Sequence, residues 1–265
     1  MKTGKLAAIL IAITFLFVAV ISCVMLFSVK EVRVDYSVSD QIDLSSTSKK
    51  LDSFVGKSFV FLNVDDVKNS VSDPLLEVVS VDKQFPNVIN VEIKQRREVY
   101  KFNHDGNVYT TDENGFVFHS QIDDGSDFSD RQTIKLNFEK VNLERVEVGS
   151  NLSTSDNELL KNIFEMAKAI DLTDRVKEIT VVNTTLDGNE DYVVMRSAEF
   201  QTYTGVKVVI ENAYEYGVER VVAAFNAYDE ATDYVKTFDV IKVVRITETG
   251  QIKVIFTSGY NQNED

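Results

Sequence analysis

The chain has 265 residues, 44% of them hydrophobic, and a formal net charge of -14 at pH 7. This acidic balance argues against nucleic acid as a partner, because a phosphate backbone requires a basic face, and it disfavours docking onto anionic lipid headgroups. The sequence holds one cysteine and two histidines, too few for a disulfide framework or a histidine-rich metal centre.

An uncharged apolar run extends from Leu6 to Phe27, and Lys2 and Lys5 precede it. About 20 apolar residues with a rise of ~1.5 Å each cross the ~30 Å hydrocarbon core of a bilayer, so the run predicts one transmembrane helix. The lysines before it favour residues 1–5 as a cytoplasmic tail. We therefore expect a single-pass cell-membrane protein with the bulk of its chain outside the cytoplasm.

Two alternatives concern the same run. A cleaved signal peptide normally has an apolar region of only ~7–15 residues, which is shorter than this run. Cys23 follows Ser22 and could accept a lipid, although an apolar segment directly after the cysteine is unusual for a lipoprotein. We expect an uncleaved anchor, and lipidation of Cys23 stays open.

Short strands and helices alternate between residues 28 and 97. In chain order we expect a strand at 29–36, a helix at 49–55, a helix capped by Asp65, and strands at 76–81 and 88–93. Gly56 is expected to stop the first helix, with Leu51, Phe54 and Val55 on its buried face, and Pro74 to end the second. This order can close one three-stranded sheet against two helices.

Strand patterns dominate from residue 98 to 258, and residues 259–265 have the composition of a disordered tail. Turns at Asp105-Gly106 and Asn114-Gly115 separate three short strands. The clearest helix extends from Ser155 to Ile170, with Ser155 and Glu158 as a capping box. Further elements are strands at 176–182, 192–196 and 206–210, a helix at 215–228 with Val218, Val221, Val222 and Phe225 inward, and a hairpin of residues 238–246 and 251–257. The fold class is thus α+β, with a mostly antiparallel second domain.

The first module has a familiar order of motifs. Gly56 followed by an apolar run, a capped helix, Asp73-Pro74 and Phe85-Pro86 resembles the polypeptide-transport-associated (POTRA) module. The strand ending at Ile93, followed by Arg96 and Arg97, continues the likeness. Placed after a single N-terminal span, this β-α-α-β-β module is similar to that of the FtsQ/DivIB family of bacterial division proteins.

The next segment extends the resemblance into a β domain. Family members carry an apolar-Asp-x-x-Gly-apolar turn there, and Asp112 to Gly115, between Tyr109 and Phe118, matches it. The family usually has a proline soon after the arginine, whereas Glu98 and Val99 occupy that region here. The resemblance covers about residues 1–120 by motif and the remainder by layout.

The resemblance implies a non-enzymatic scaffold of the divisome, concentrated at the division septum. It implies membrane-anchored coiled-coil partners of the FtsB/DivIC and FtsL type and a role in recruiting or regulating septal peptidoglycan synthesis. A second hypothesis is an anchored extracytoplasmic sensor or cell-wall-binding module. A third is a cell-wall hydrolase with an unrecognised carboxylate pair. We expect no cofactor, no nucleic acid and no small-molecule substrate.

Other local patterns give no catalytic or metal-binding candidate. Gly56-Lys57-Ser58 is similar to the end of a phosphate-binding loop, but the earlier glycine is missing, so a helix stop is the better interpretation. The acidic stretches at 123–127 and 187–191 lack the spacing of a calcium loop. His104 and His119 have no nucleophile or ligand set around them.

The last strand is the predicted partner-binding site. Ile252, Val254 and Phe256 alternate with Gln251, Lys253, Ile255 and Thr257, so one face can pack inward while the other stays accessible. If the strand ends its sheet, its outer N–H and C=O groups can accept a strand from a partner, and the resemblance implies the same region. The predicted partner-binding residues are Gln251, Ile252, Lys253, Val254, Ile255, Phe256 and Thr257.

Overall fold

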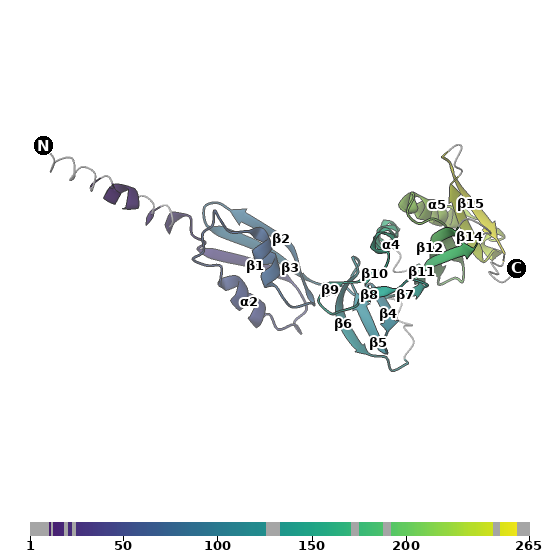
Figure 1. The fold of residues 1–265 in the computed structure, drawn as a ribbon, viewed down its shortest axis with the longest axis horizontal. Coiled ribbons are helices and arrows are strands. Elements are labelled where there is room, and N and C mark those ends of the chain that lie inside the picture. Colours follow the sequence, from purple (N-terminus) through teal and green to yellow (C-terminus); the bar gives the residue numbers. More distant parts are fainter. Residues whose placement is uncertain are drawn as a thin grey trace. The chain divides into compact units, whose positions relative to one another are not determined.

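The computed structural model describes residues 11, 13–18, 21–22, 25–125, 133–170, 175–187, 192–245 and 250–258 (Figure 1). The chain divides into two compact units, one up to Arg96 and one from Arg97 onward. The predicted tail at 259–265 lies outside the described residues, as do residues 6–10, 12, 19–20 and 23–24 of the predicted span. Among the helical segments that are described, none is both long and apolar enough to cross a membrane.

The first unit is a small sheet covered by helices. Its elements are β1 (Glu31–Ser37), α2 (Ser45–Asp52), α3 (Val64–Ser70), β2 (Leu76–Gln84) and β3 (Val88–Gln95). In the part of the chain described, the sheet has three strands in the order β1-β3-β2, with β1 parallel and β2 antiparallel to β3. The predicted order of strand, helix, helix, strand, strand is confirmed.

One apolar core holds this unit together. Leu51 of α2, Val67 of α3, and Ile89 and Ile93 of β3 are fully buried in it. The first helix lies earlier than predicted, because it ends at Asp52 and the chain then turns through residues 53–56. Val55 therefore leaves the helical face and is 48% exposed, contrary to the prediction.

The cap of α3 also differs from the prediction. Asn63, not Asp65, is the N-cap, and its side chain accepts the N–H of Asp65 at 3.1 Å. Both residue types cap helices well, and Asn63 stands where the backbone is still extended, with ψ of 130°. Asp65 lies instead in the first turn, where its negative charge faces the positive end of the helix dipole.

The second unit is built on one large sheet. Its strands are β4 (Tyr100–His104), β5 (Asn107–Thr111), β6 (Phe116–Ile122), β7 (Ile134–Glu139), β8 (Leu143–Arg145), β9 (Ser150–Asn151), β10 (Ser153–Thr154), β11 (Val176–Asp187), β12 (Tyr192–Thr202), β13 (Lys207–Ile210), β14 (Val240–Arg245) and β15 (Ile252–Thr257). Among described residues, ten strands follow the order β15-β14-β13-β12-β11-β7-β4-β5-β6-β9, and β8 and β10 form a separate pair. The mixed α+β class is confirmed.

The sheet has a short seam at β7. This strand pairs parallel with β11 over five residue pairs, from Glu178↔Lys135 to Val182↔Glu139. On its other side it pairs parallel with β4 at Tyr100↔Ile134 and Lys101↔Lys135. The N-terminal half of the sheet is therefore joined to the C-terminal half by these two residue pairs, fewer than join β4 to β5, β11 to β12 or β14 to β15.

Two helices cover the core face of this sheet, α4 (Asn157–Ala169) and α5 (Gly217–Glu230). The N-cap of α4 is Asp156, whose side chain accepts the N–H of Leu159 at 3.1 Å, so the predicted capping box at Ser155 is wrong by one residue. On α5, Val221 and Phe225 are buried as predicted, but Val218 is 38% exposed. Ala224 and Arg220 are buried instead, because the inward face is rotated from the one that hydrophobicity indicates.

Candidate partner-binding edge

The edge strand of the large sheet is β15. It pairs antiparallel with β14 from Val240↔Thr257 to Arg245↔Ile252, and the described strands include no neighbour on its other side. Peptide groups of an antiparallel strand alternate in direction, so every second N–H and C=O of β15 points away from β14. Such a row of outward groups is the template that strand addition requires.

The two faces of β15 have different neighbours. Ile252, Val254 and Phe256 are half-buried and pack against the core, as their alternation predicts. This core face lies beneath α5 (Figure 1). Lys253 is exposed on the opposite face, where Ile255 lies next to Lys242 of β14. An added strand could therefore place side chains over both an apolar and a charged surface.

An aromatic pair adjoins the Thr257 end of this edge, and sequence reasoning missed it. Tyr234 is 74% exposed and its ring meets the ring of Phe238 edge-on, with centroids 5.9 Å apart. The 3-10 turn Val235–Thr237 lies between them and leads into β14, whose first residue pairs with Thr257. Exposed aromatic side chains are typical anchors of protein interfaces. The available signal was a pair of aromatic residues, Tyr234 and Phe238, in the short connector between α5 and β14.

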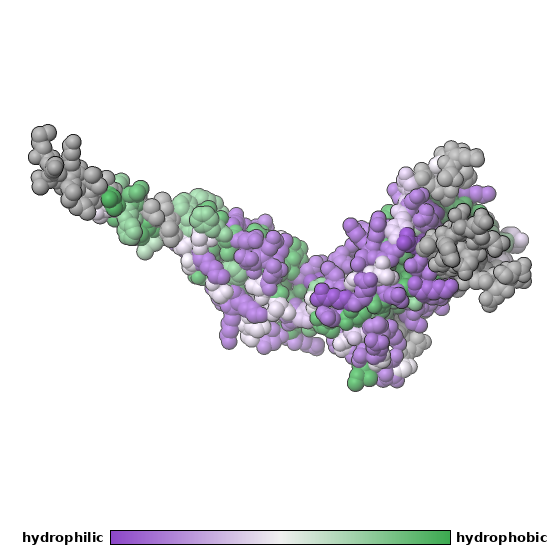
Figure 2. Space-filling model, in the orientation of Figure 1, coloured by the Kyte–Doolittle hydropathy of each residue, from purple (hydrophilic) through white to green (hydrophobic). Residues whose placement is uncertain are grey.

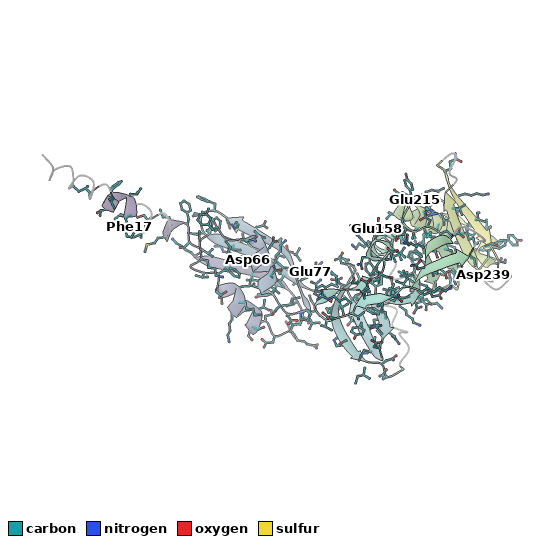
Figure 3. All side chains as sticks on the ribbon, in the orientation of Figure 1. Phe17, Asp66, Glu77, Glu158, Glu215 and Asp239 are labelled. Atoms are coloured by element: carbon teal, nitrogen blue, oxygen red, sulfur yellow. The ribbon has the colours of Figure 1, made fainter. Side chains whose placement is uncertain are left out.

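The start of α5, which lies over the edge, is fixed by Arg220. This buried side chain donates through its Nη1 to the carbonyl oxygens of Glu211, Asn212 and Glu215, at 2.5, 3.0 and 3.4 Å. The loop it holds has left-handed backbone at Asn212 and Tyr216, with φ of 50° and 53°. Figure 3 labels Glu215 directly before α5 and Asp239 directly before β14. The amide of Lys207 donates to the Asp239 carbonyl at 2.8 Å, next to the first β13–β14 pair.

A polar cluster connects this loop to the cap of α4. The hydroxyl of Tyr214 donates to Oδ2 of Asp156, and Nε of Arg196 lies 2.9 Å from the same oxygen. The Arg196 guanidinium also lies over the Tyr214 ring, 4.9 Å from its centroid. Burial first, and then the bond to the Asp156 carboxylate, raise the pKa of Tyr214 to about 12. The protonated tyrosine is thus a structural donor.

Replacing Tyr214 with phenylalanine should lower the free energy of unfolding at pH 8 by about 1–2 kcal/mol, since it removes a bond to a charged acceptor. A raised tyrosine pKa means that the folded state favours the protonated form. The advantage is complete below the unfolded pKa of ~10 and is lost as pH rises to about 12. Urea unfolding at several pH values should therefore show the two proteins converging across this window. A difference that stays constant would contradict the assignment.

The remaining sequence candidates have structural roles. The amides of Gly56 and Lys57 donate to the carbonyls of Val29 and Phe54 at 2.8 and 3.1 Å, so they hold a turn and do not form a phosphate cradle. His104 lies 3.3 Å from Asp105, and His119 is exposed on β6. Within the described ranges no group of three or more His, Cys, Asp or Glu side chains could hold a metal ion.

The first unit is bounded by the predicted anchor on one side and by Arg96 on the other. Of the predicted anchor residues, Leu6 lies outside the described residues, and Phe27 is described and half-buried. Arg96 donates its amide to the Leu75 carbonyl at 2.8 Å and lies 3.8 Å from Glu77. Glu77 is on β2 and becomes a neighbour of Arg96 only in the folded sheet.

Comparison with known proteins agrees with this architecture. Residues 27–96 match the family described as "POTRA domain, FtsQ-type". The chain is 25% identical over 161 residues to the cell division protein DivIB of Clostridium acetobutylicum, and the aligned segment covers 59% of each of the two chains. It is 29% identical over 133 residues to the cell division protein DivIB of Clostridium tetani, and this alignment covers 46% of the present chain and 44% of that protein.

The resemblance to the FtsQ/DivIB family is confirmed. The family match ends at residue 96, as the first unit does, and it includes β1, α2, α3, β2 and β3. The aligned segments span less than two thirds of the length of either DivIB relative.

Proposed function

We propose that this chain is a non-enzymatic, membrane-anchored scaffold of the bacterial divisome. It is anchored by the apolar run from Leu6 to Phe27, with the folded units outside the cytoplasm and concentrated at the septum. It binds short coiled-coil membrane proteins of the FtsB/DivIC and FtsL type and helps recruit or regulate septal peptidoglycan synthesis. The FtsQ-type POTRA match and the two DivIB relatives support the divisome role.

The observation that carries the binding role is the position of β15 at the end of the sheet. One side of the strand is held by β14, and its core face is held by α5. The strand is therefore kept extended before a partner arrives, which reduces the conformational entropy lost on binding. Lys253 is the kind of charged residue that keeps an open edge from pairing indiscriminately with other chains.

Hydrogen exchange tests this proposal directly. In the free protein, alternate amides of β15 should exchange rapidly, because they point to water, and the amides between them should be protected by β14. Adding an FtsB/DivIC-type protein should slow the fast set, while exchange at β9, the other end of the sheet, should not change. Partner binding without any new protection in β15 would place the interface elsewhere.

A matched pair of variants at one position gives the second test. Lys253→Pro removes a backbone donor and disturbs the edge, whereas Lys253→Ala removes the side chain and keeps the N–H. We expect the proline variant to weaken partner binding about tenfold or more, ~1.4 kcal/mol, and the alanine variant to bind nearly as tightly as the original. Circular dichroism must show both variants folded. A folded proline variant with full affinity would exclude strand addition at this edge.

A further inference from the structure

Exposed apolar side chains gather in two loops of the first unit. Val60 and Phe61 follow Phe59 before α3 and are 59% and 88% exposed, and Phe85, in the turn between β2 and β3, is 73% exposed. Figure 2 shows apolar colour at this end of the unit, beside the N-terminal segment. We call these residues, Val60, Phe61 and Phe85, the apolar collar.

Both loops are fixed to the end of the apolar run. The amide of Phe59 donates to the Phe27 carbonyl at 2.7 Å, and the amide of Lys30 donates to the Asn87 carbonyl at 2.9 Å. The Phe85 ring contacts the rings of Phe27 and Phe59, with centroids 5.7 and 6.5 Å apart. The collar is thus held by backbone and ring contacts to residues 27–30.

This geometry sets the depth of the collar if Phe27 ends a membrane span. Phe61 follows Phe59 by two residues and can lie at most ~7 Å farther along the chain. Each polar interfacial layer of a bilayer is itself about 5–8 Å thick. The collar therefore falls within the layer where partly buried phenylalanine side chains of surface-bound segments are stable.

Three lysines lie in or next to the segments that carry the collar, although the whole chain is acidic. Lys30 and Lys57 are exposed, and Nζ of Lys83 lies 5.6 Å from the centre of the Phe59 ring. Lysine side chains at a membrane surface place their aliphatic stems among the lipid tails and their ammonium groups at the phosphates. Apolar side chains with lysines in the same segments match a phospholipid surface in both hydrophobicity and charge.

We propose that the apolar collar docks the first unit onto the outer surface of the bilayer. The proposal rests on the membrane anchor of the proposed function, and it adds a second, specific contact with lipid. Docking restrains the unit against rotation about residues 27–30, so the POTRA-type domain is held at the surface in one orientation. A flexible attachment at the end of the span would leave that orientation free.

Single-tryptophan fluorescence tests the proposal, because the chain contains no tryptophan. The full chain is reconstituted in vesicles of phosphatidylcholine and phosphatidylglycerol, with Phe61→Trp or Phe85→Trp as reporters. Val79→Trp is the matched control, since Val79 is a 45% exposed apolar residue of the same unit, six residues before Phe85 on β2. Phe17→Trp reports on the anchor itself; Phe17 is labelled in Figure 3.

The collar reporters should be quenched several-fold more strongly by brominated phospholipid than the Val79→Trp control, and less strongly by aqueous iodide. Quenching of Phe17→Trp by brominated lipid together with collar reporters that behave like the control would overturn docking and leave the anchor intact. A Phe17→Trp reporter open to iodide would overturn the anchor and docking together. Shielding of the collar only after a division partner is added would assign it to a protein and overturn the lipid contact.

Discussion

Replacing Gly115 with alanine should lower the free energy of unfolding of the second unit by about 3 kcal/mol or more, from strain and overpacking together. Gly115 has φ of +78°, and a Cβ built there would lie 2.3 Å from Cε2 of Phe164. The Phe164 ring cannot withdraw easily, because it stacks on the buried Tyr100 ring with centroids 5.0 Å apart. Both the backbone and the packing therefore oppose a methyl group.

Gly106→Ala is the matched control. Gly106 has nearly the same φ, +75°, but a Cβ there meets nothing within 4 Å. It should cost only the backbone strain, about 1–2 kcal/mol. Urea unfolding monitored by circular dichroism gives both values. Equal losses for the two variants would show that Phe164 yields, and would contradict the packing argument.

The surrounding turn explains why glycine stands at this point. Oδ1 of Asp112 accepts the amides of Asn114 and Phe116, both at 2.9 Å, and thereby closes the turn between β5 and β6. The carbonyl of Gly115 accepts the amide of Leu152 at 2.9 Å. The turn is tied at both ends, so it cannot shift away from Phe164. In the Asp-x-x-Gly pattern, Asp112 therefore closes the turn, and Gly115 leaves room for the Phe164 ring.

Arg220→Met is expected to be the other severe substitution, with a loss of about 2–3 kcal/mol, because hydrogen bonds to a charged group contribute roughly 1.5–3 kcal/mol. Methionine fills a similar volume but leaves the carbonyls of Glu211, Asn212 and Glu215 without the donor that holds them. The loop would then lose the restraint on its left-handed residues, and α5 would shift over β15. We expect partner binding to weaken along with stability.

Arg175→Met provides the control for this prediction. Arg175 pairs with Asp229 of the same helix α5, but its side chain is 40% exposed. Surface ion pairs contribute roughly 0–1 kcal/mol, so this variant should remain close to the original protein in urea unfolding. If Arg175→Met were as damaging as Arg220→Met, the burial of the Arg220 contact would not be the cause.

Local sequence patterns predicted the first unit well because its elements are short and separated by strong turn signals. Two of the incorrect predictions concern helices, one the start of α4 and the other the inward face of α5. Residues 153–157 are Ser, Thr, Ser, Asp and Asn, all of which can cap a helix, so spacing alone could not select Asp156. On α5, hydrophobicity favoured Val218, whereas the tertiary contacts of Arg220 set the rotation of the helix.

The candidate edge was only partly accessible to sequence reasoning. Alternation predicted which face of β15 packs on the core, because that signal is local to the strand. Its place at the end of the sheet depends on parallel pairings between distant segments, such as β13 with β14 across α5, and no local pattern encodes them. The exposure of Tyr234 could not be predicted, because it depends on how the connector between α5 and β14 folds.

The short seam at β7 has a consequence for cooperativity. The strands from β9 to β4 are joined to the strands from β7 to β15 by two residue pairs of the ladder, and beyond those by side-chain packing in the shared core. The two halves can therefore separate from each other without either half unfolding, because breaking the seam disrupts few backbone hydrogen bonds. A pulling force between the N-terminal and C-terminal ends of the second unit would break the β4–β7 pairing first. The sheet would then part into two pieces, with β15 still paired to β14 in one of them.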